Sequence, residues 1–293
     1  MSSAEEANEV SSVSADGTPV GVEIDPTAGA HYDTSNDFYR LWLDPSLTYS
    51  CAYFARDDES LQDAQMGKLD LAFAKVGLRP GHRLLDIGCG WGTAALRASE
   101  RYGAEAVGLT VSEAQFELAQ ARASARTGVE FRLEPWETYE GRCDRIVSFE
   151  ALEHFTAAKY PAFFGRCREL LPADGRLLLQ TITVGKPSRS FSLLRYAYFL
   201  HDQLFFRAEL PRPEQVVKVA REAGLELVHA ESLRRHYVRT IETWLANLER
   251  NREAAIAATD PKTYEMYVRY LTGAARYHRT GETNVYQLLF AVA

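Results

Sequence analysis

A glycine-rich turn carries the clearest chemical signal in the sequence. Gly88, Gly90 and Gly92 directly follow an apolar run, and glycines at such a turn let the backbone approach a ligand closely. Asp86 precedes the first glycine by two positions, and its carboxylate can accept hydrogen bonds from a cationic or polyhydroxy ligand. Residue 93 is threonine, so the G-x-G-x-x-G fingerprint is not met, although a nucleotide-binding Rossmann domain stays open as the alternative.

Two glutamates stand close together after a later apolar run. Glu150 and Glu153 follow residues 145–149, at the strand end where α/β sheets keep their ligands. Two carboxylates in one cleft raise the pKa of one of them, which makes a base that works near neutral pH. The sequence leaves open that Glu150 instead points to solvent or binds an amino group of the ligand. His154 is interpreted as a structural or supporting histidine.

The elements that must position these residues alternate along the chain. Short apolar runs follow stretches with helical spacing, and glycine or proline turns separate them. This order predicts an α/β fold with a mostly parallel sheet and helices on both faces. The predicted helices are 61–76, 93–102, 112–126, 160–171 and 214–223. The predicted strands are 83–87, 104–109, 129–133, 145–149, 176–182, 225–232 and 287–292.

Two stretches interrupt this alternation, and such insertions usually carry substrate contacts. Residues 186–207 are rich in Phe, Tyr and Leu with basic residues among them, and residues 241–280 predict two long helices. Residues 1–30 contain no aromatic residue and predict a mobile tail. Residues 31–293 are then expected to form a single domain.

Composition limits the class of protein further. The chain has 293 residues, of which 46% are hydrophobic and 25% charged, as in globular proteins with a large core. Four scattered cysteines without C-x-x-C spacing argue against a disulfide scaffold and a structural zinc site, and no metal site is predicted. The net charge of −7 argues against non-specific nucleic-acid binding. An acidic N-terminus and no apolar run of about 18 residues predict a cytoplasmic protein.

Five segments follow one another in an order that is typical of one enzyme family. They are HYDTSNDF at 31–38, LTYSCAYF at 47–54, LLDIGCGWG at 84–92, GLTVSEAQ at 108–115 and LEHF at 152–155. Together they resemble the cyclopropane fatty acid synthase family, and most closely its mycolic acid cyclopropane synthase branch. The resemblance covers about residues 31–293.

The resemblance implies a Rossmann-like methyltransferase that uses S-adenosylmethionine (SAM), with helical insertions that form an acyl-binding region. Such enzymes transfer the SAM methyl group to the cis double bond of an unsaturated fatty acyl chain. A carbocation forms, a bound bicarbonate removes a proton from the added methyl group, and a cyclopropane ring closes. Related members resolve the cation differently and give methyl-branched or otherwise unclosed lipids. A small-molecule methyltransferase of a natural-product pathway is the alternative from another class.

The resemblance also implies which residues hold each ligand. Those expected to bind SAM are Tyr32, Tyr49, Ser50, Asp86, Gly88, Cys89, Gly90, Trp91, Gly92, Thr110, Gln115, Trp136 and Glu137. Those expected at the bicarbonate site are Cys51, Glu153, Gln180 and Tyr237.

Gln180 and the nearby Glu150 depart from the family pattern. Gln180 stands where the family usually has histidine, and an amide cannot carry a proton, so a histidine relay is lost. Glu150 stands where the family usually has a small residue. We expect bicarbonate still to bind, with Gln180 supplying one hydrogen bond, while Glu150 is the alternative base.

The implied partner is an unsaturated acyl lipid, carried on acyl carrier protein or within a phospholipid, and no nucleic acid. The aromatic stretch 186–207 predicts a helix that lids an acyl tunnel, touches anionic lipid or docks an acidic carrier protein. An ordinary buried helix is the alternative for this stretch. A cytoplasmic protein with peripheral membrane contact is compatible with these predictions.

Overall fold

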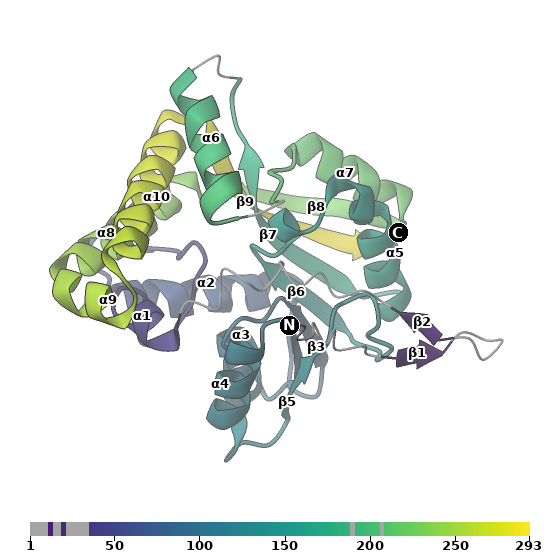
Figure 1. Cartoon of the computed structure of the whole chain (residues 1–293). Coiled ribbons are helices and arrows are strands. Elements are labelled where there is room, and N and C mark those ends of the chain that lie inside the picture. Colours follow the sequence, from purple (N-terminus) through teal and green to yellow (C-terminus); the bar gives the residue numbers. More distant parts are fainter. Residues whose placement is uncertain (1–10, 14–18, 22–34, 188–190, 206–207) are drawn as a thin grey trace, which may run out of the picture.

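The computed structural model describes residues 11–13, 19–21, 35–187, 191–205 and 208–293 (Figure 1). The predicted mobile tail, residues 1–30, lies mostly outside these ranges and stays a prediction, and Tyr32 lies outside them as well. Within that stretch the structure describes two short antiparallel strands that the sequence did not predict, β1 (Ser11–Val13) and β2 (Pro19–Gly21).

Seven strands form the central sheet, in the order β5-β4-β3-β6-β7-β9-β8. They are β3 (Arg83–Ile87), β4 (Glu105–Thr110), β5 (Val129–Leu133), β6 (Arg145–Phe149), β7 (Arg176–Val184), β8 (Leu225–Ser232) and β9 (Thr283–Val292). The neighbouring strands from β5 to β7 are parallel, and β9 runs antiparallel to both β7 and β8. The predicted mostly parallel sheet is therefore confirmed.

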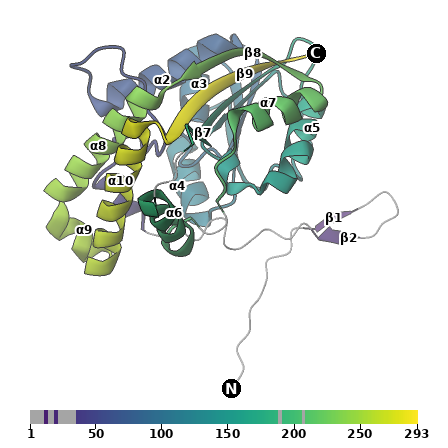
Figure 2. The same cartoon turned by 90° about the horizontal axis from the view of Figure 1, so that it is seen from above.

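Helices cover both faces of the sheet (Figure 2). One layer holds α2 (Leu61–Val76), α3 (Thr93–Tyr102) and α4 (Glu113–Ala123), and the other holds α5 (Tyr160–Leu170) and α7 (Pro213–Glu222). Successive residues of a strand pack against different layers, because their side chains point to opposite faces of the sheet. On β7, for example, Leu178 packs with the first layer and Leu177 with the second.

The remaining helices gather beside the sheet, and we call them the cap (Figures 1 and 2). They are α1 (Asn36–Arg40), α6 (Phe191–Gln203), α8 (Arg234–Arg250), α9 (Arg252–Ala258) and α10 (Pro261–Thr280). The two helices predicted for residues 241–280 are three, because Asn251 ends α8 and Asp260 caps α10, with α9 between them. Across the described ranges, no helix is both long and apolar enough to cross a membrane.

Candidate active site

The predicted site residues meet at the carboxyl ends of β3, β4 and β6, beneath the cap. The turn that follows β3 is fixed to β4, because the amides of Gly88 and Cys89 donate to the carbonyl oxygen of Leu109 at 3.0 and 2.9 Å. A Cβ atom at Gly88 would lie 2.6 Å from that of Ala151, so packing alone explains this glycine. A Cβ atom at Gly90, where φ is +54°, would meet no described atom within 4 Å. Room for a ligand therefore lies against Gly90.

Asp86 is the acidic group of this turn. The residue is 1% exposed, and neither carboxylate oxygen has a hydrogen-bond partner among the described residues. Burial raises the pKa of Asp86 to about 7, although the positive charge of Lys68 lowers it in part. Because a buried carboxylate without donors is costly, Asp86 fits a ligand that brings donors or positive charge. The amino group and sulfonium of SAM have this chemistry.

Lys68, on α2, is a buried cation that the sequence reasoning missed. Its Nζ donates to Oγ of Ser50 at 2.7 Å and lies 4.6 Å from the ring centroid of Phe149. Burial lowers the pKa of Lys68 to about 8, opposed by the charges of Glu150 and other acids. Helical periodicity could have found it, since Lys68 shares the buried face of α2 with Leu61.

Tyr49 and Ser50 directly precede Cys51 and were predicted to bind SAM. The Tyr49 ring packs against Trp42 and Trp244, with centroid distances of 5.2 and 5.4 Å. Its hydroxyl donates to that of Tyr270 at 3.3 Å. Ser50 is buried and its hydroxyl accepts from Nζ of Lys68, so this serine positions the lysine.

Thr110 and Gln115 lie at the end of β4 and on α4. Thr110 Oγ1 donates to Oε1 of Gln115 at 2.9 Å, and both side chains are buried. Ser112 caps α4 by accepting from the amide of Gln115. The bond to Oε1 turns the amide nitrogen of Gln115 away from Thr110, which suits a donor to a ligand hydroxyl.

Trp136 and Glu137 lie on the loop after β5. The buried Trp136 ring packs between Phe155 and Phe163, with centroid distances of 5.7 and 5.4 Å. Glu137 forms an ion pair of 2.9 Å with Lys159. Their contacts with the adenine and ribose of SAM stay predictions.

The other residues that were predicted to bind SAM stabilise the turn by packing. Trp91 is buried, and its Nε1 donates to Oδ1 of Asn36 at 2.7 Å, which ties the turn to α1. A side chain at Gly92 would overlap the ring of Phe131. Cys89 is buried as well, and burial raises the pKa of its thiol. These residues shape the turn through packing.

The carboxylate of Glu150 lies at the centre of the predicted catalytic residues. Its Oε1 accepts from the backbone amide of Cys51 and from Nε2 of Gln180, both at 2.8 Å. Its Oε2 accepts from the hydroxyl of Tyr237 at 2.7 Å. Glu150 is only 9% exposed, so the alternative that it points to solvent is wrong. The backbone φ of Glu150 is +56°, a left-handed conformation that is uncommon outside glycine.

The expected bicarbonate site is thus arranged differently from the prediction. The Cys51 thiol faces two backbone carbonyl oxygens, the nearer at 3.2 Å, and burial raises its pKa. Cys51 contributes its amide instead. The donors of Cys51, Gln180 and Tyr237 all meet Glu150, including the hydrogen bond that Gln180 was expected to give to bicarbonate.

A chain of hydrogen bonds fixes the orientation of the Gln180 amide. The ammonium of Lys75 can only donate, and it donates to Oε1 of Gln287 at 2.6 Å. Gln287 Nε2 must then donate to Oε1 of Gln180, at 3.0 Å, which leaves Nε2 of Gln180 to face Glu150. Sequence reasoning missed Gln287, although a lone amide at the start of the apolar run 287–292 was a detectable signal.

Glu153 is the second carboxyl group of the site. Its Oε1 accepts from the amide of Ile182, and its Oε2 is buried without a partner in the part of the chain that the structure describes. Burial and the charge of Glu150 raise the pKa of Glu153 to about 8, so it is mostly protonated at neutral pH. Burial also lowers the pKa of His154 to about 4, which keeps this imidazole neutral.

A cationic co-substrate accounts for both the open side of the turn at Gly90 and the unpartnered Asp86. Solved methyltransferases share the overall fold. Coclaurine N-methyltransferase, bound to N-methylheliamine and SAH, superposes with a TM-score of 0.78 at 22% identity, over 92% of this chain and 82% of that chain. The protein is a SAM-dependent methyltransferase of Rossmann-like fold.

Within that class, the chain belongs to the mycolic acid cyclopropane synthetase family, whose family model matches residues 25–288. Cyclopropane mycolic acid synthase 1 of Mycobacterium tuberculosis is 43% identical over 88% of this chain and 94% of its own length. The solved cyclopropane synthase MmaA2 of the same organism has a TM-score of 0.89 at 39% identity, covering 90% of this chain and 97% of that chain. CmaA1 complexed with SAH and CTAB has a TM-score of 0.88 at 42% identity, covering 90% and 97%.

The raised pKa of Asp86 predicts that SAM affinity increases with pH. Without ligand, the carboxyl group is largely protonated below about pH 7, whereas binding a cation favours the carboxylate. Affinity should therefore fall by up to about tenfold per pH unit as the pH decreases below about 7. Calorimetry in two buffers of different ionisation enthalpy should detect proton release on binding. Asp86→Asn should remove this pH dependence, and a flat wild-type profile would contradict the assignment.

Proposed function

We propose that the protein transfers the methyl group of SAM to a carbon of a cis double bond in an unsaturated acyl chain. The product is a cyclopropane ring, formed through a carbocation. Family membership supports this proposal, since the relatives named above are cyclopropane mycolic acid synthases. The resemblance implied bicarbonate as the base. Bicarbonate is not part of this proposal, because the donors expected to hold it bind Glu150.

The observation that carries the proposal is an aromatic wall beside the glycine turn. The ring of Tyr39 lies 5.1 Å from that of Trp91 in the turn and 5.6 Å from Tyr49, and Trp42 continues the wall at 5.2 Å from Tyr49. Tyr39 and Trp42 are fully buried, so the half-buried Tyr49 is the ring of this wall whose face can attract a cation such as the sulfonium of SAM or a carbocation. A wall of rings also excludes water, which would convert the cation to an alcohol.

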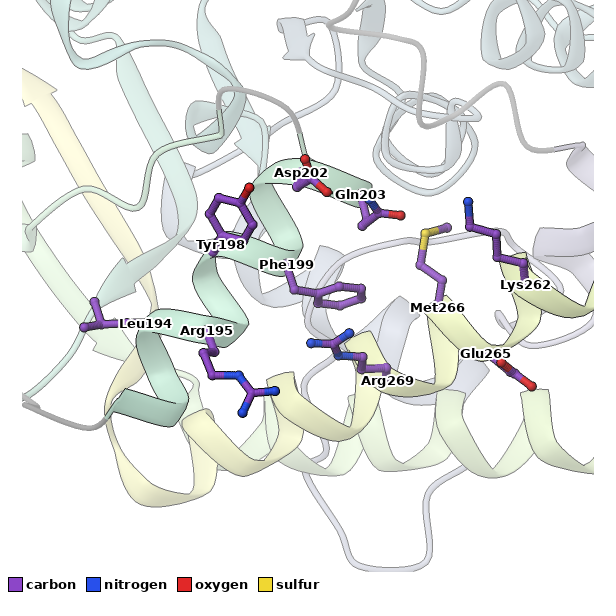
Figure 3. A pocket seen from close by; sticks show the side chains of 10 residues that line it. All are labelled: Leu194, Arg195, Tyr198, Phe199, Asp202, Gln203, Lys262, Glu265, Met266 and Arg269. Atoms are coloured by element: carbon purple, nitrogen blue, oxygen red, sulfur yellow. Dashed lines mark hydrogen bonds between the residues drawn. The ribbon is translucent and has the colours of Figure 1, made fainter.

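A groove between α6 and α10 provides a path for the acyl chain (Figure 3). Its volume of about 660 Å³ is typical of small-molecule sites. Phe199 points from α6 towards α10, where Met266 lines the groove and the guanidinium of Arg269 lies 4.0 Å from the Phe199 ring centroid. The apolar side chains suit an acyl chain, and the three basic residues Arg195, Lys262 and Arg269, which outnumber the acids Asp202 and Glu265, suit an anionic head group.

The outer face of α6 supports peripheral contact with a membrane. Phe191, Leu194 and Tyr198 follow helical spacing on one face and are 74, 66 and 72% exposed. Arg195 lies beside them, and basic residues next to exposed aromatic ones favour the surface of an anionic bilayer. The proposed substrate is therefore an acyl chain in a phospholipid at a membrane surface, and a chain on acyl carrier protein is the other source to be tested.

The test is incubation with labelled SAM and a panel of unsaturated acyl donors. The panel holds the same monounsaturated chain in anionic phospholipid vesicles, on acyl carrier protein and on coenzyme A. We expect label on carbon, a mass increase of one CH₂ unit and loss of the alkene protons in the NMR spectrum. The donor with the highest kcat/KM identifies the carrier.

A matched saturated chain is the control and should accept no methyl group. Label found only in an ester or ether would overturn the proposal and favour a small-molecule methyltransferase. A methyl-branched product would retain the methyl transfer and overturn only the ring closure.

Tyr198→Ser should lower turnover on vesicles more than on coenzyme A if the outer face of α6 binds the bilayer.

A further inference from the structure

We propose that Glu150 is the catalytic base of this reaction, a carboxylate built into the chain that makes added bicarbonate unnecessary. The inference rests on the proposed function and concerns the same site. Glu150 follows β6, and the adjacent Ala151 packs so closely on the glycine turn that a Cβ atom at Gly88 would lie 2.6 Å from its own. The carboxylate therefore lies one residue from the turn that binds SAM.

The hydrogen bonds leave one oxygen of Glu150 able to take a proton. A carboxylate has about four acceptor positions, two on each oxygen. Oε1 uses both, for the Cys51 amide and for Nε2 of Gln180. Within the described part of the chain, Oε2 accepts only from the hydroxyl of Tyr237, so one of its positions stays open. The basic atom of the site is therefore Oε2.

The surroundings assign different protonation states to the two glutamates. Burial raises the pKa of Glu150, but the donors on Cys51, Tyr237 and Gln180 and the charge of Lys68 oppose that rise. Glu153 accepts from the amide of Ile182, and burial together with the charge of Glu150 raises its pKa to about 8. The three donors on Glu150 favour its ionised form, whereas Oε2 of Glu153, which has no donor among the described residues, favours the neutral form. Paired carboxylates whose environments separate their pKa values are a pattern of acid–base sites.

The backbone gives independent support. Glu150 adopts φ of +56°, where a side chain is strained and glycine is not. Strained residues persist where their position is functionally useful, and this conformation aims the carboxylate inward, towards the hydroxyl of Tyr237. The Tyr237 ring in turn packs against the ring of Trp244, with a centroid distance of 6.1 Å, and both belong to one buried hydrophobic cluster.

The proton transfer is balanced without another reactant. When the methyl carbon has bonded to one alkene carbon, S-adenosylhomocysteine has left and the other alkene carbon is cationic. A C–H bond of the methyl group breaks, and its electron pair forms the second bond of the ring to the cationic carbon. The proton bonds to Oε2 of Glu150, which becomes neutral and returns the proton to solvent after product release.

The test measures methyl transfer in decarbonated buffer, with and without sodium bicarbonate. Wild-type turnover should be the same in both. Glu150→Gln keeps the shape of the side chain but removes the carboxylate, and it should lose about 100-fold or more in kcat under both conditions. Glu150→Gly should lose as much in decarbonated buffer, but bicarbonate or formate should restore at least about tenfold, because the freed donors can hold a small anion. Glycine adopts this φ without strain, so this variant is expected to fold.

Glu140→Gln, an exposed carboxylate on a neighbouring loop, is the control and should leave turnover unchanged. Calorimetric SAM binding should be retained in both Glu150 variants, which separates loss of the base from loss of the fold. Wild-type turnover that disappears with removal of bicarbonate, or full activity of Glu150→Gln, would overturn the inference and leave the proposed function intact. If the wild type transfers no methyl group to any unsaturated acyl chain, the proposed function fails instead.

Discussion

Replacing Gly90 with valine is expected to abolish SAM binding. The Cβ of any residue at this position would enter the space that no described atom fills within 4 Å, and valine would add two methyl groups there. We expect calorimetric affinity to fall by about 100-fold or more, which corresponds to about 2.7 kcal/mol. Turnover at subsaturating SAM should fall in proportion.

The backbone strain of this substitution needs a matched control. Gly77, at the C-terminus of α2, also has a positive φ, +64°, and a Cβ atom there would likewise meet no described atom within 4 Å. Gly77→Val therefore costs similar strain outside the site. Loss of SAM binding in both variants would attribute the effect to strain. Unchanged affinity in Gly90→Val would contradict the assignment of the turn as the SAM site.

Truncating Trp244 to alanine should destabilise the protein by about 4 kcal/mol. Trp244 on α8 is fully buried and packs against Trp42, Tyr49 and Tyr237, with centroid distances of 5.7, 5.4 and 6.1 Å. The cavity would remove support from Tyr237, whose hydroxyl holds Glu150. Urea unfolding at neutral pH should report the loss of stability, and kcat should fall as well.

Trp244→Phe is the matched control for this prediction. The indole Nε1 of Trp244 is buried without a hydrogen-bond partner in the described ranges, so phenylalanine keeps most of the packing and removes an unsatisfied donor. We expect this variant to lose less than about 1.5 kcal/mol. Equal destabilisation by alanine and phenylalanine would contradict the cavity argument.

Local signals predicted the sheet well. The strand predicted over residues 83–87 has the same bounds as β3, and the glycine turn follows it as predicted. Both are local features of the sequence, a buried strand and a turn with left-handed backbone. The cap was predicted less well. The break between α8 and α10 depends on the capping of Asp260 and on tertiary packing, and α1 is too short to show a helical period.

The sequence predicted which residues form the site, but only in part how they contact one another. The family pattern named Cys51, Gln180 and Tyr237, and the structure brings all three together. It could not indicate that an additional glutamate receives their donors, since that depends on a backbone conformation rather than on residue types. Gln287 was missed for a similar reason, because the value of a lone amide in a strand depends on which strand pairs with it.

The place of β9 between β7 and β8 has a consequence for biogenesis. Gln287 on β9 pairs directly with Gln180 on β7, 107 positions earlier, so the orientation of the amide that faces Glu150 depends on a strand that is synthesised well after β7. Earlier elements can form while the chain is being synthesised, with β7 as an exposed edge that is prone to aggregation until β9 inserts. Contacts over such long sequence separation form slowly. Maturation of enzymatic competence should therefore lag behind secondary structure during refolding, and the interval between them is the time in which a chaperone would be of most use.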